Sequence, residues 1–239
     1  MARKPEGFEG FRPQALDFFR DLAANNERGW FTEHKPVYER EVLAPFRLLL
    51  SAVTAQLAAR EIPLSADPAR AIFRIHRDVR FSHDKTPYKT HAGAVLSRDG
   101  GKAASGILYV HVAPEGCFTA AGFWQPEREQ LGAIREAVYT EPDRFAGVQS
   151  VLGEAGLALD DSDSLTRMPR GFEDAAEAPN SGAIRLKSFI VRRPIDSGRL
   201  ASPALATDIV DFAEAALPLL RFGWSAISVL DPTALTRQK

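Results

Sequence analysis

Three short apolar runs separated by tight turns constrain the fold of this chain more than any other feature. The runs cover residues 92–96, 106–112 and 117–124. A turn containing Gly100 and Gly101 separates the first two runs, and the short segment APEG separates the last two. Such short connections join antiparallel strands, whereas parallel strands need a crossover of a dozen or more residues. The sequence therefore predicts an antiparallel meander and argues against a βαβ unit in this region.

Apolar residues at helical spacing predict helices on both sides of this meander. Proline suits the first position of a helix, and it marks several of the predicted starts. One predicted helix begins at Pro13, a second covers residues 36–60 and a third begins at residue 125. Two more cover residues 142–155 and 203–220. Pro45 lies inside the second pattern, so a kink or a break is expected near Leu43.

Three further segments have the composition of strands, namely residues 71–75, 165–168 and 186–191. The chain contains no internal repeat, no low-complexity segment and no linker rich in glycine and serine. We therefore expect a single α+β domain over residues 1–239, with its core at about 8–220. Its central, mostly antiparallel sheet should be flanked by N-terminal and C-terminal helices.

The composition is typical of a soluble protein, with 45% hydrophobic and 26% charged residues. No run approaches the roughly 20 apolar residues of a membrane span, and the N-terminus lacks the apolar stretch of a signal peptide, so no membrane partner is expected. The single cysteine, Cys117, excludes an intrachain disulfide and suggests a reducing compartment. We therefore expect a cytoplasmic protein. The sequence predicts no oligomeric state.

The stretch from Arg70 to Gly93 is strongly basic in a chain whose net charge is −1. It contains four arginines, two lysines, three histidines and only two aspartates. Arginine and lysine are the usual binding groups for phosphate and carboxylate, and loops held by strands often carry binding sites. The sequence therefore predicts a site for a small phosphorylated or carboxylated ligand, which the protein binds and possibly turns over. The candidate ligand-binding residues are Asn26, Arg28, Arg77, Arg80, Lys85, Thr86, Tyr88, Lys89 and Trp124, and the catalytic candidates are Asp78, Asp84 and Lys85.

The same residues are compatible with other roles. A structural ion-pair network would also cluster these charges, with Phe81, Pro87 and Tyr88 holding the loop against the body of the protein. A nucleic-acid-binding module would combine phosphate contacts with base stacking on Phe73, Phe81 and Tyr88, although the net charge of −1 argues against it. A protein-interaction module, anchored by arginine and tyrosine, is a third alternative.

Other common sites are not indicated. The five histidines form no two-histidine helical motif, and one cysteine cannot build a structural zinc site, so no metal site is predicted. A magnesium ion on Asp78 or Asp84 together with a substrate phosphate is compatible with the sequence. Cys117 opens an apolar strand and is expected to be inert. The sequence contains no G-x-S-x-G, P-loop or G-x-G-x-x-G motif, and it indicates no cofactor.

Four segments together resemble one known family. They are NNERGWFTEHKPVYE, RIHRDVRFSHDKTPYKTHAG, the GFWQP segment, and RMPRGFEDAAEAP followed by RLKSF. The chain resembles the conserved hypothetical proteins of domain-of-unknown-function family 2461 over about residues 8–220. The resemblance implies membership of this family and no particular activity.

The family's motifs match this chain residue by residue. The matching positions are Asn25, Asn26, Arg28 and Trp30; Arg77, Asp78, Arg80, Phe81, Ser82, Asp84, Lys85, Thr86, Pro87, Tyr88 and Lys89; Trp124 and Pro126; and Lys187, Ser188 and Phe189. This chain has Ala120-Ala121-Gly122 where the family pattern is richer in glycine. The pattern also does not require histidine at positions 76, 83 or 91. Both differences argue against a mechanism that depends on a glycine cradle or on these histidines.

Overall fold

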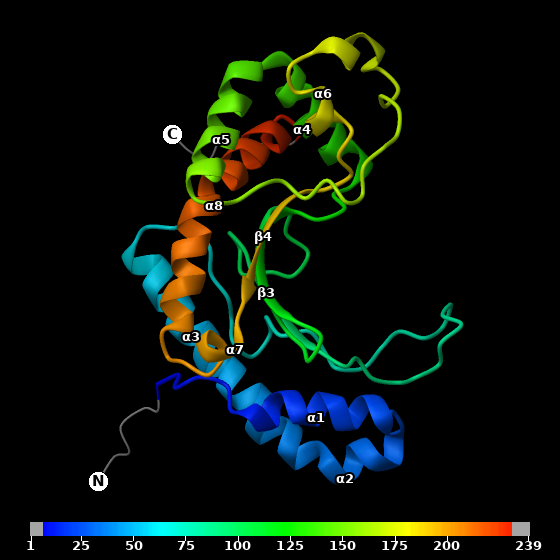
Figure 1. Ribbon diagram of the computed structural model, residues 1–239, viewed down its shortest axis with the longest axis vertical. Coiled ribbons are helices and arrows are strands. Elements are labelled where there is room, and N and C mark those ends of the chain that lie inside the picture. The colour runs from blue at the N-terminus through cyan, green and yellow to red at the C-terminus, as the bar shows by residue number, and fades with distance from the viewer. Residues whose placement is uncertain (1–6, 231–239) are drawn as a thin grey trace. The chain divides into compact units, whose positions relative to one another are not determined.

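A computed structural model describes residues 7–230 of the chain and contains a four-stranded sheet. The strands are β1 (Ala92–Leu96), β2 (Ile107–Val112), β3 (Cys117–Phe123) and β4 (Phe189–Ile195). They are antiparallel and adjacent in sequence order, β1-β2-β3-β4 (Figure 1). In the first pair Ala92 lies opposite Val112 and Leu96 opposite Leu108. The predicted antiparallel meander is confirmed.

Helices precede and follow the first three strands, which confirms the α+β class. The helices before them are α1 (Pro13–Ala24), α2 (Arg28–Tyr38) and α3 (Ala44–Ala59), with a π-helical turn at Glu39–Leu43. The helices after them are α4 (Arg128–Thr140), α5 (Pro142–Glu154), α6 (Ser181–Ile184), α7 (Ser197–Leu200) and α8 (Leu205–Ser228), with a 3₁₀ turn at Glu173–Glu177.

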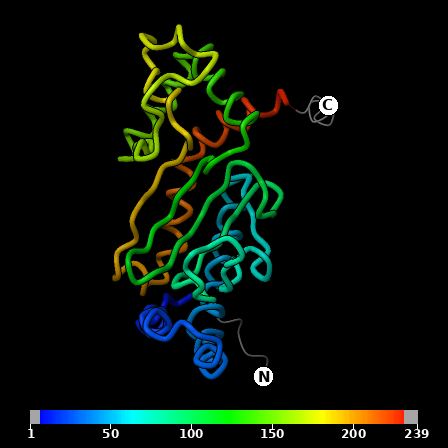
Figure 2. Tube along the Cα trace, turned by 90° about the vertical axis from the view of Figure 1, so that its right-hand side faces the viewer, coloured from blue at the N-terminus to red at the C-terminus, as the bar shows by residue number. Residues whose placement is uncertain are grey.

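The N-terminal helices form because their apolar residues share one face. In α1 the buried residues include Phe19 and Leu22, and α1 lies beside α2 (Figures 1 and 2). The change expected near Leu43 takes the form of the π-helical turn. There the N–H of Ala44 bonds the carbonyl of Glu39 five residues earlier, and Pro45 has no N–H to donate. The turn lets the chain pass the proline without ending the helix.

Residues 28–59 therefore form one continuous helix of 32 residues. By length and composition this helix could cross a membrane, although the buried core helix of a soluble protein meets the same criteria. Phe46, Leu49 and Leu57 are fully buried within the protein, whereas Trp30, Leu43 and Leu48 are partly exposed.

Several predicted boundaries differ from the structure. Residues 71–75 form no strand, because they pair with the chain around β1 only at isolated bridges such as Ile72 to Ala94. Residues 165–168 likewise form no strand, and Ser164 bridges Leu186 alone. The last strand begins at Phe189, because the backbone N–H of Leu186 bonds Ala183 in a turn that ends α6. The final helix continues beyond residue 220 to Ser228.

The described part of the chain divides into two compact units. The first unit contains residues 7–104, 108–119 and 194–212, and the second contains residues 105–107, 120–193 and 213–230. The first unit therefore includes α1 to α3, β1 and most of β2. The expectation of a single domain stays a prediction.

Candidate functional site

The basic stretch forms a long arm, defined here as residues 76–88, in the first unit (Figure 1). The two sides of the arm are joined at its base, where His76 bridges Tyr88 and the N–H of Arg77 donates to the carbonyl of Pro87 at 2.9 Å. Asn26 fastens this base from the α1–α2 connection. Its side-chain amide donates to the carbonyl of Tyr88 and accepts from the N–H of Tyr88, both at 3.0 Å. The structure thus uses both polar atoms of Asn26 to hold the arm.

Tyr88 lies in the interior at the base of the arm. Its side chain is 5% exposed, and its ring stacks on Phe31 with 4.2 Å between centroids. A ring buried in this way has no open face for a nucleic-acid base. The packing of Tyr88 against Phe31 holds the two ends of the arm to the first unit.

The basic side chains of the arm have partners within the arm. The guanidinium of Arg77 donates to Asp84 at 2.5 Å and also to the hydroxyl of Thr86. Arg80 binds both oxygens of Asp78, at 2.9 and 2.6 Å. These contacts make the ion-pair network that the sequence allowed as an alternative to a ligand site.

The remaining contacts of the arm complete this network. The ammonium of Lys85 donates to the carbonyl of Val79 at 3.0 Å. Hydrogen bonds from the N–H of Thr86 and from Arg77 lower the pKa of Asp84 to about 2, and Arg80 lowers the pKa of Asp78. A carboxylate whose pKa is lowered is a weaker proton acceptor near pH 7. The geometry therefore does not favour Asp78 or Asp84 as a general base.

Phe81 does not hold the arm against the body of the protein, so that expectation is wrong. Its side chain is 95% exposed at the tip. The last backbone hydrogen bond between the two sides of the arm joins Arg77 to Pro87, and Phe81 lies beyond it. The buried ring of Tyr88 holds the arm instead.

Two further candidates lie apart from the arm's network. Arg28 begins α2 and is exposed. Trp124 belongs to the second unit, where it follows β3 and is 59% exposed. The next residue, Gln125, has a positive φ of 40°, and its N–H donates to the hydroxyl of Ser188 at 2.9 Å.

A second group of basic side chains, which we call the cationic cluster, consists of Arg74, Lys89 and Lys102. The ammonium groups of Lys89 and Lys102 lie 5.4 and 5.2 Å from the ring centroid of Phe73. Lys102 also donates to the carbonyl of Ile72 at 2.6 Å. Within residues 7–230, no carboxylate lies within salt-bridge distance of any of the three.

The charges in the cationic cluster repel one another. Partial burial and the positive charge of Arg74 lower the pKa of Lys89. The same two causes, followed by the charge of Lys89, lower the pKa of Lys102. A bound anion would relieve this repulsion. Lys89 was predicted from the basic stretch, whereas Lys102 was missed because its turn carried only a signal for hairpin geometry.

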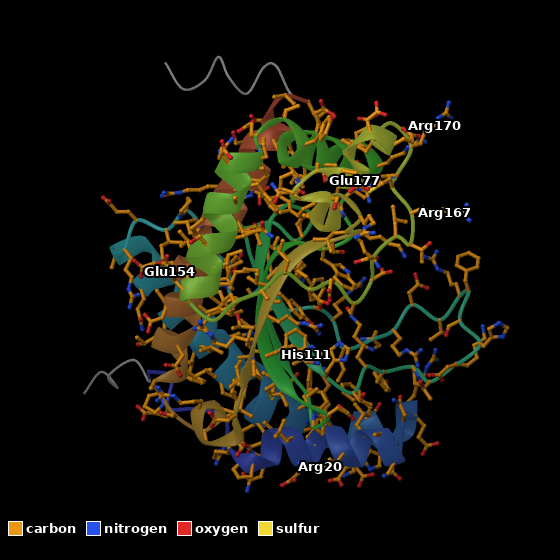
Figure 3. The ribbon with its side chains drawn as sticks, turned by 45° about the horizontal axis from the view of Figure 1, so that its top comes forward. Arg20, His111, Glu154, Arg167, Arg170 and Glu177 are labelled. Carbon is orange, nitrogen blue, oxygen red and sulfur yellow. The ribbon has the colours of Figure 1, made fainter. Side chains whose placement is uncertain are left out.

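A row of partly exposed rings continues from the cationic cluster. We define this aromatic row as Phe73, Tyr109, His111 and Phe118. The ring centroids of Phe73 and Tyr109 are 6.4 Å apart, those of Tyr109 and His111 are 5.9 Å apart, and those of His111 and Phe118 are 4.6 Å apart. His111 lies among the strands in Figure 3. The row therefore begins at the ring that the two lysines share.

The pattern of β2 explains this arrangement. Leu108, Val110 and Val112 are buried, so the alternating residues Tyr109 and His111 share the opposite face of the strand. Tyr109 lies across β1 at Gly93, where a Cβ atom would overlap the hydroxyl end of the tyrosine ring. A side chain at position 93 would therefore displace the tyrosine ring.

Tyr109 and His111 are both neutral at pH 7. Their hydroxyl oxygen and Nδ1 are hydrogen-bonded at 3.0 Å. Burial raises the pKa of Tyr109 to about 12. Burial and the neighbouring His91, whose ring centroid is 4.7 Å away, lower the pKa of His111 to about 4. This end of the face therefore presents uncharged rings.

The pKa of His111 can be measured by NMR titration of the histidine ring protons. We expect His111 to titrate near pH 4, because its burial and His91 disfavour the imidazolium. The unfolded chain takes up this proton near pH 6.5, so His111 should destabilise the folded state progressively as the pH falls from 6.5 toward 4. Assignment through a His111→Gln variant identifies the signal. A midpoint near 6.5 would contradict this environment.

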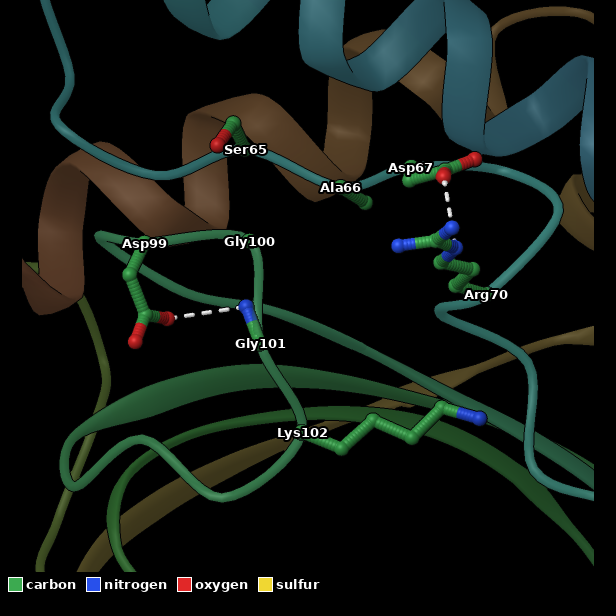
Figure 4. Close-up of a pocket in the computed structure, with 8 residues that line it drawn as sticks. All are labelled: Ser65, Ala66, Asp67, Arg70, Asp99, Gly100, Gly101 and Lys102. Atoms are coloured by element: carbon green, nitrogen blue, oxygen red, sulfur yellow. Dashed lines mark hydrogen bonds and ion pairs between the residues drawn. The ribbon is translucent and has the colours of Figure 1, made fainter.

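The first unit also contains a pocket of about 630 Å³ between two loops (Figure 4). Its lining residues are Ser65, Ala66, Asp67, Arg70, Asp99, Gly100, Gly101 and Lys102. Arg70 pairs with Asp67 at 3.6 Å, and Asp99 accepts from the N–H of Gly101 at 2.8 Å. Its acidic and basic side chains are equal in number, so the pocket lacks the excess positive charge of the cationic cluster.

A second cavity of about 370 Å³ lies in the second unit, and its lining includes Asp161, Ser164 and Arg185. Across the part of the chain that the structure describes, no three His, Cys, Asp or Glu side chains gather so that they could hold a metal ion. Cys117 is a buried free cysteine, and burial raises the pKa of its thiol.

Comparison with protein families gives a match over most of the chain. The family described as conserved hypothetical protein (DUF2461) matches residues 14–222. The chain belongs to the DUF2461 family. The resemblance seen in the sequence is confirmed, and the DUF2461 match covers all of the arm and both β-strands that carry the aromatic row. Neither the curated proteins nor the solved structures contain a match to this chain.

Proposed function

We propose that this protein binds a small phosphorylated or carboxylated ligand at the cationic cluster of Arg74, Lys89 and Lys102. The observation that supports this proposal is that the ammonium groups of Lys89 and Lys102 lie over the ring of Phe73, next to Arg74 in the chain, without a carboxylate partner among residues 7–230. Lys89 is partly buried, whereas Arg74 and Lys102 are exposed, and the lowered pKa values of the two lysines mark a place that a bound anion would stabilise. The cytoplasm is our proposed location, in keeping with the single buried thiol of Cys117.

The contacts of the arm support this choice of site over the arm itself. Arg77 and Arg80 are engaged by Asp84 and Asp78, so a ligand would have to displace existing ion pairs. The cationic cluster offers positive charge that no such pair engages. We assign no reaction to this site, because the catalytic candidates Asp78, Asp84 and Lys85 all lie in the arm's network.

The nucleic-acid alternative has less support. It relied on stacking by Phe81 and Tyr88, and Tyr88 is buried against Phe31. The basic groups near the exposed ring of Phe81 are also engaged within the arm. A long polyanion would therefore find few free cations there.

The proposal is tested by thermal unfolding with inorganic phosphate, using sodium chloride at matched ionic strength as the reference. Phosphate should raise the unfolding temperature of the natural protein. Lys89→Ala should weaken phosphate binding about tenfold or more, because a hydrogen bond to a charged group contributes about 1.5–3 kcal/mol. The matched control is Lys85→Ala, which removes a lysine that donates to Val79.

The control variant distinguishes the two candidate positions. Lys85→Ala should retain the full response to phosphate. If Lys85→Ala abolished the response and Lys89→Ala preserved it, the anion would bind on the arm and the proposed position would be wrong. A natural protein whose unfolding temperature is the same in phosphate and in chloride would reject an anion site.

A further inference from the structure

We propose that the ligand is a nucleoside monophosphate, with its phosphate on the cationic cluster and its base packed on the aromatic row. This inference rests on the proposed anion site and adds the chemical class of the ligand. The observation behind it is the continuity of the two groups. Phe73 has the ammonium groups of Lys89 and Lys102 over its ring, and the same ring lies 6.4 Å from that of Tyr109.

The face divides into a charged end and an uncharged end. At the charged end are Arg74, Lys89 and Lys102, where partial burial and then mutual repulsion lower the pKa of both lysines. At the other end, Tyr109 and His111 are neutral at pH 7, and their rings and that of Phe118 are partly exposed. A ligand that fits both ends carries an anionic group beside an apolar planar ring.

A planar heterocycle packs on aromatic side chains better than an aliphatic ligand group does. Rings pack on one another in offset or edge-on arrangements, and every nucleic-acid base presents a π-face. The Tyr109 hydroxyl and His111 Nδ1 are hydrogen-bonded to each other, so the row offers the second ring nitrogen of His111 and the remaining lone pair of the hydroxyl at its middle. A nucleobase combines a flat ring with polar edges, which matches this surface.

The number of cations available favours a single nucleotide over a nucleic-acid chain. The cationic cluster contains three positive groups, two of them over the ring of Phe73, whereas Arg77 and Arg80 are paired within the arm. One phosphate can engage several of the three, but a polynucleotide needs a cationic track of many phosphate contacts. The net charge of −1 also provides no general attraction for a polyanion.

Calorimetric titration separates the contribution of the base from that of the phosphate. The probes are ribose 5-phosphate, adenosine 5′-monophosphate and uridine 5′-monophosphate. At least one nucleotide should bind roughly 5- to 150-fold more tightly than ribose 5-phosphate, the factor expected for packing one base on aromatic side chains. Equal affinities for all three would overturn the inference and leave the proposed anion site standing.

A matched pair of variants locates the base. Phe118→Leu keeps an apolar side chain but removes the ring beside His111. This variant should lose most of the extra affinity for the nucleotide, while its affinity for ribose 5-phosphate is unchanged. Phe81→Leu makes the same exchange at the exposed tip of the arm and should change neither affinity. A loss caused by Phe81→Leu instead would overturn the assignment of the base to the aromatic row.

Two more readouts complete the test. In the natural protein, the NMR signals of the His111 and Tyr109 rings should shift when the nucleotide is added and shift less when ribose 5-phosphate is added. This measurement needs no variant, so its result does not depend on how a variant folds. The affinity should not increase from the mononucleotide to oligonucleotides of increasing length. Growth with length would overturn the inference in favour of a single-stranded nucleic acid. Failure to bind inorganic phosphate would instead reject the proposed anion site itself.

Discussion

Phe46→Ala should lower the free energy of unfolding by about 3–5 kcal/mol, the usual cost of removing a phenylalanine ring from a packed core. Phe46 is completely buried, and its ring meets that of Phe11 edge-on with 5.7 Å between centroids. Its helix is part of the continuous segment 28–59 that supplies much of the core of the first unit. The loss combines the transfer of the ring to water with the cavity left beside Phe11.

The matched control is Phe81→Ala, which makes the same change at a side chain that is 95% exposed. It should leave the free energy of unfolding within about 0.5 kcal/mol of the natural value. Both residues belong to the first unit, so urea unfolding followed by circular dichroism reports the same structure for the two variants. A loss of more than about 1 kcal/mol in Phe81→Ala would show that the tip of the arm packs against the protein.

Gly122→Ala should destabilise the second unit by about 2–6 kcal/mol, the sum of two costs. Gly122 has a φ of +131°, and a Cβ atom there would overlap the carbonyl oxygen of Phe189 and lie 2.9 Å from the Cα of Ile190. The backbone strain contributes about 1–3 kcal/mol, and the overpacking contributes about 1–3 kcal/mol more. The clashing atoms belong to the backbone of β4, so a change of rotamer cannot relieve the overlap.

Gly132→Ala is the matched control in the same unit. Gly132 lies inside α4, and nothing comes within 4 Å of a Cβ atom built on it. Alanine is the better helix former by about 0.5–1 kcal/mol, so this variant should be slightly more stable than the natural protein. Thermal unfolding measures both variants. Equal effects of the two substitutions would contradict the close approach of β3 and β4 at Gly122.

Local signals in the sequence were enough to predict the elements whose structure depends on local geometry. The short connections before residues 106–112 and 117–124 permit only antiparallel pairing, and the meander β1-β2-β3 follows from them. Pro13 and Pro142 marked the starts of α1 and α5, because the proline ring fixes φ at a helical value. The extent of β4 and α8 depended on packing and was predicted less well.

The basic composition of residues 70–93 was also evident from the sequence, but the pairing of its charges was not. Arg77 meets Asp84 because the two sides of the arm fold back on each other, whereas Arg80 meets Asp78 within one side, two residues earlier in the chain. Lys89 lies a few residues further on, yet no carboxylate among the described residues reaches it. Composition reports how many charges a segment holds, whereas the distances between them decide which charges are neutralised.

The sequence by itself determined the fold class, the family, and the segment in which positive charge is concentrated, because these follow from residue types and short-range spacing. Only the tertiary structure showed that Lys102, in a turn 30 residues from Ile72, joins Lys89 on the ring of Phe73. It also showed that Tyr88 is buried and Phe81 exposed, although hydrophobicity alone would bury both. Burial and electrostatic interaction act through space, so residues far apart in the chain decide them.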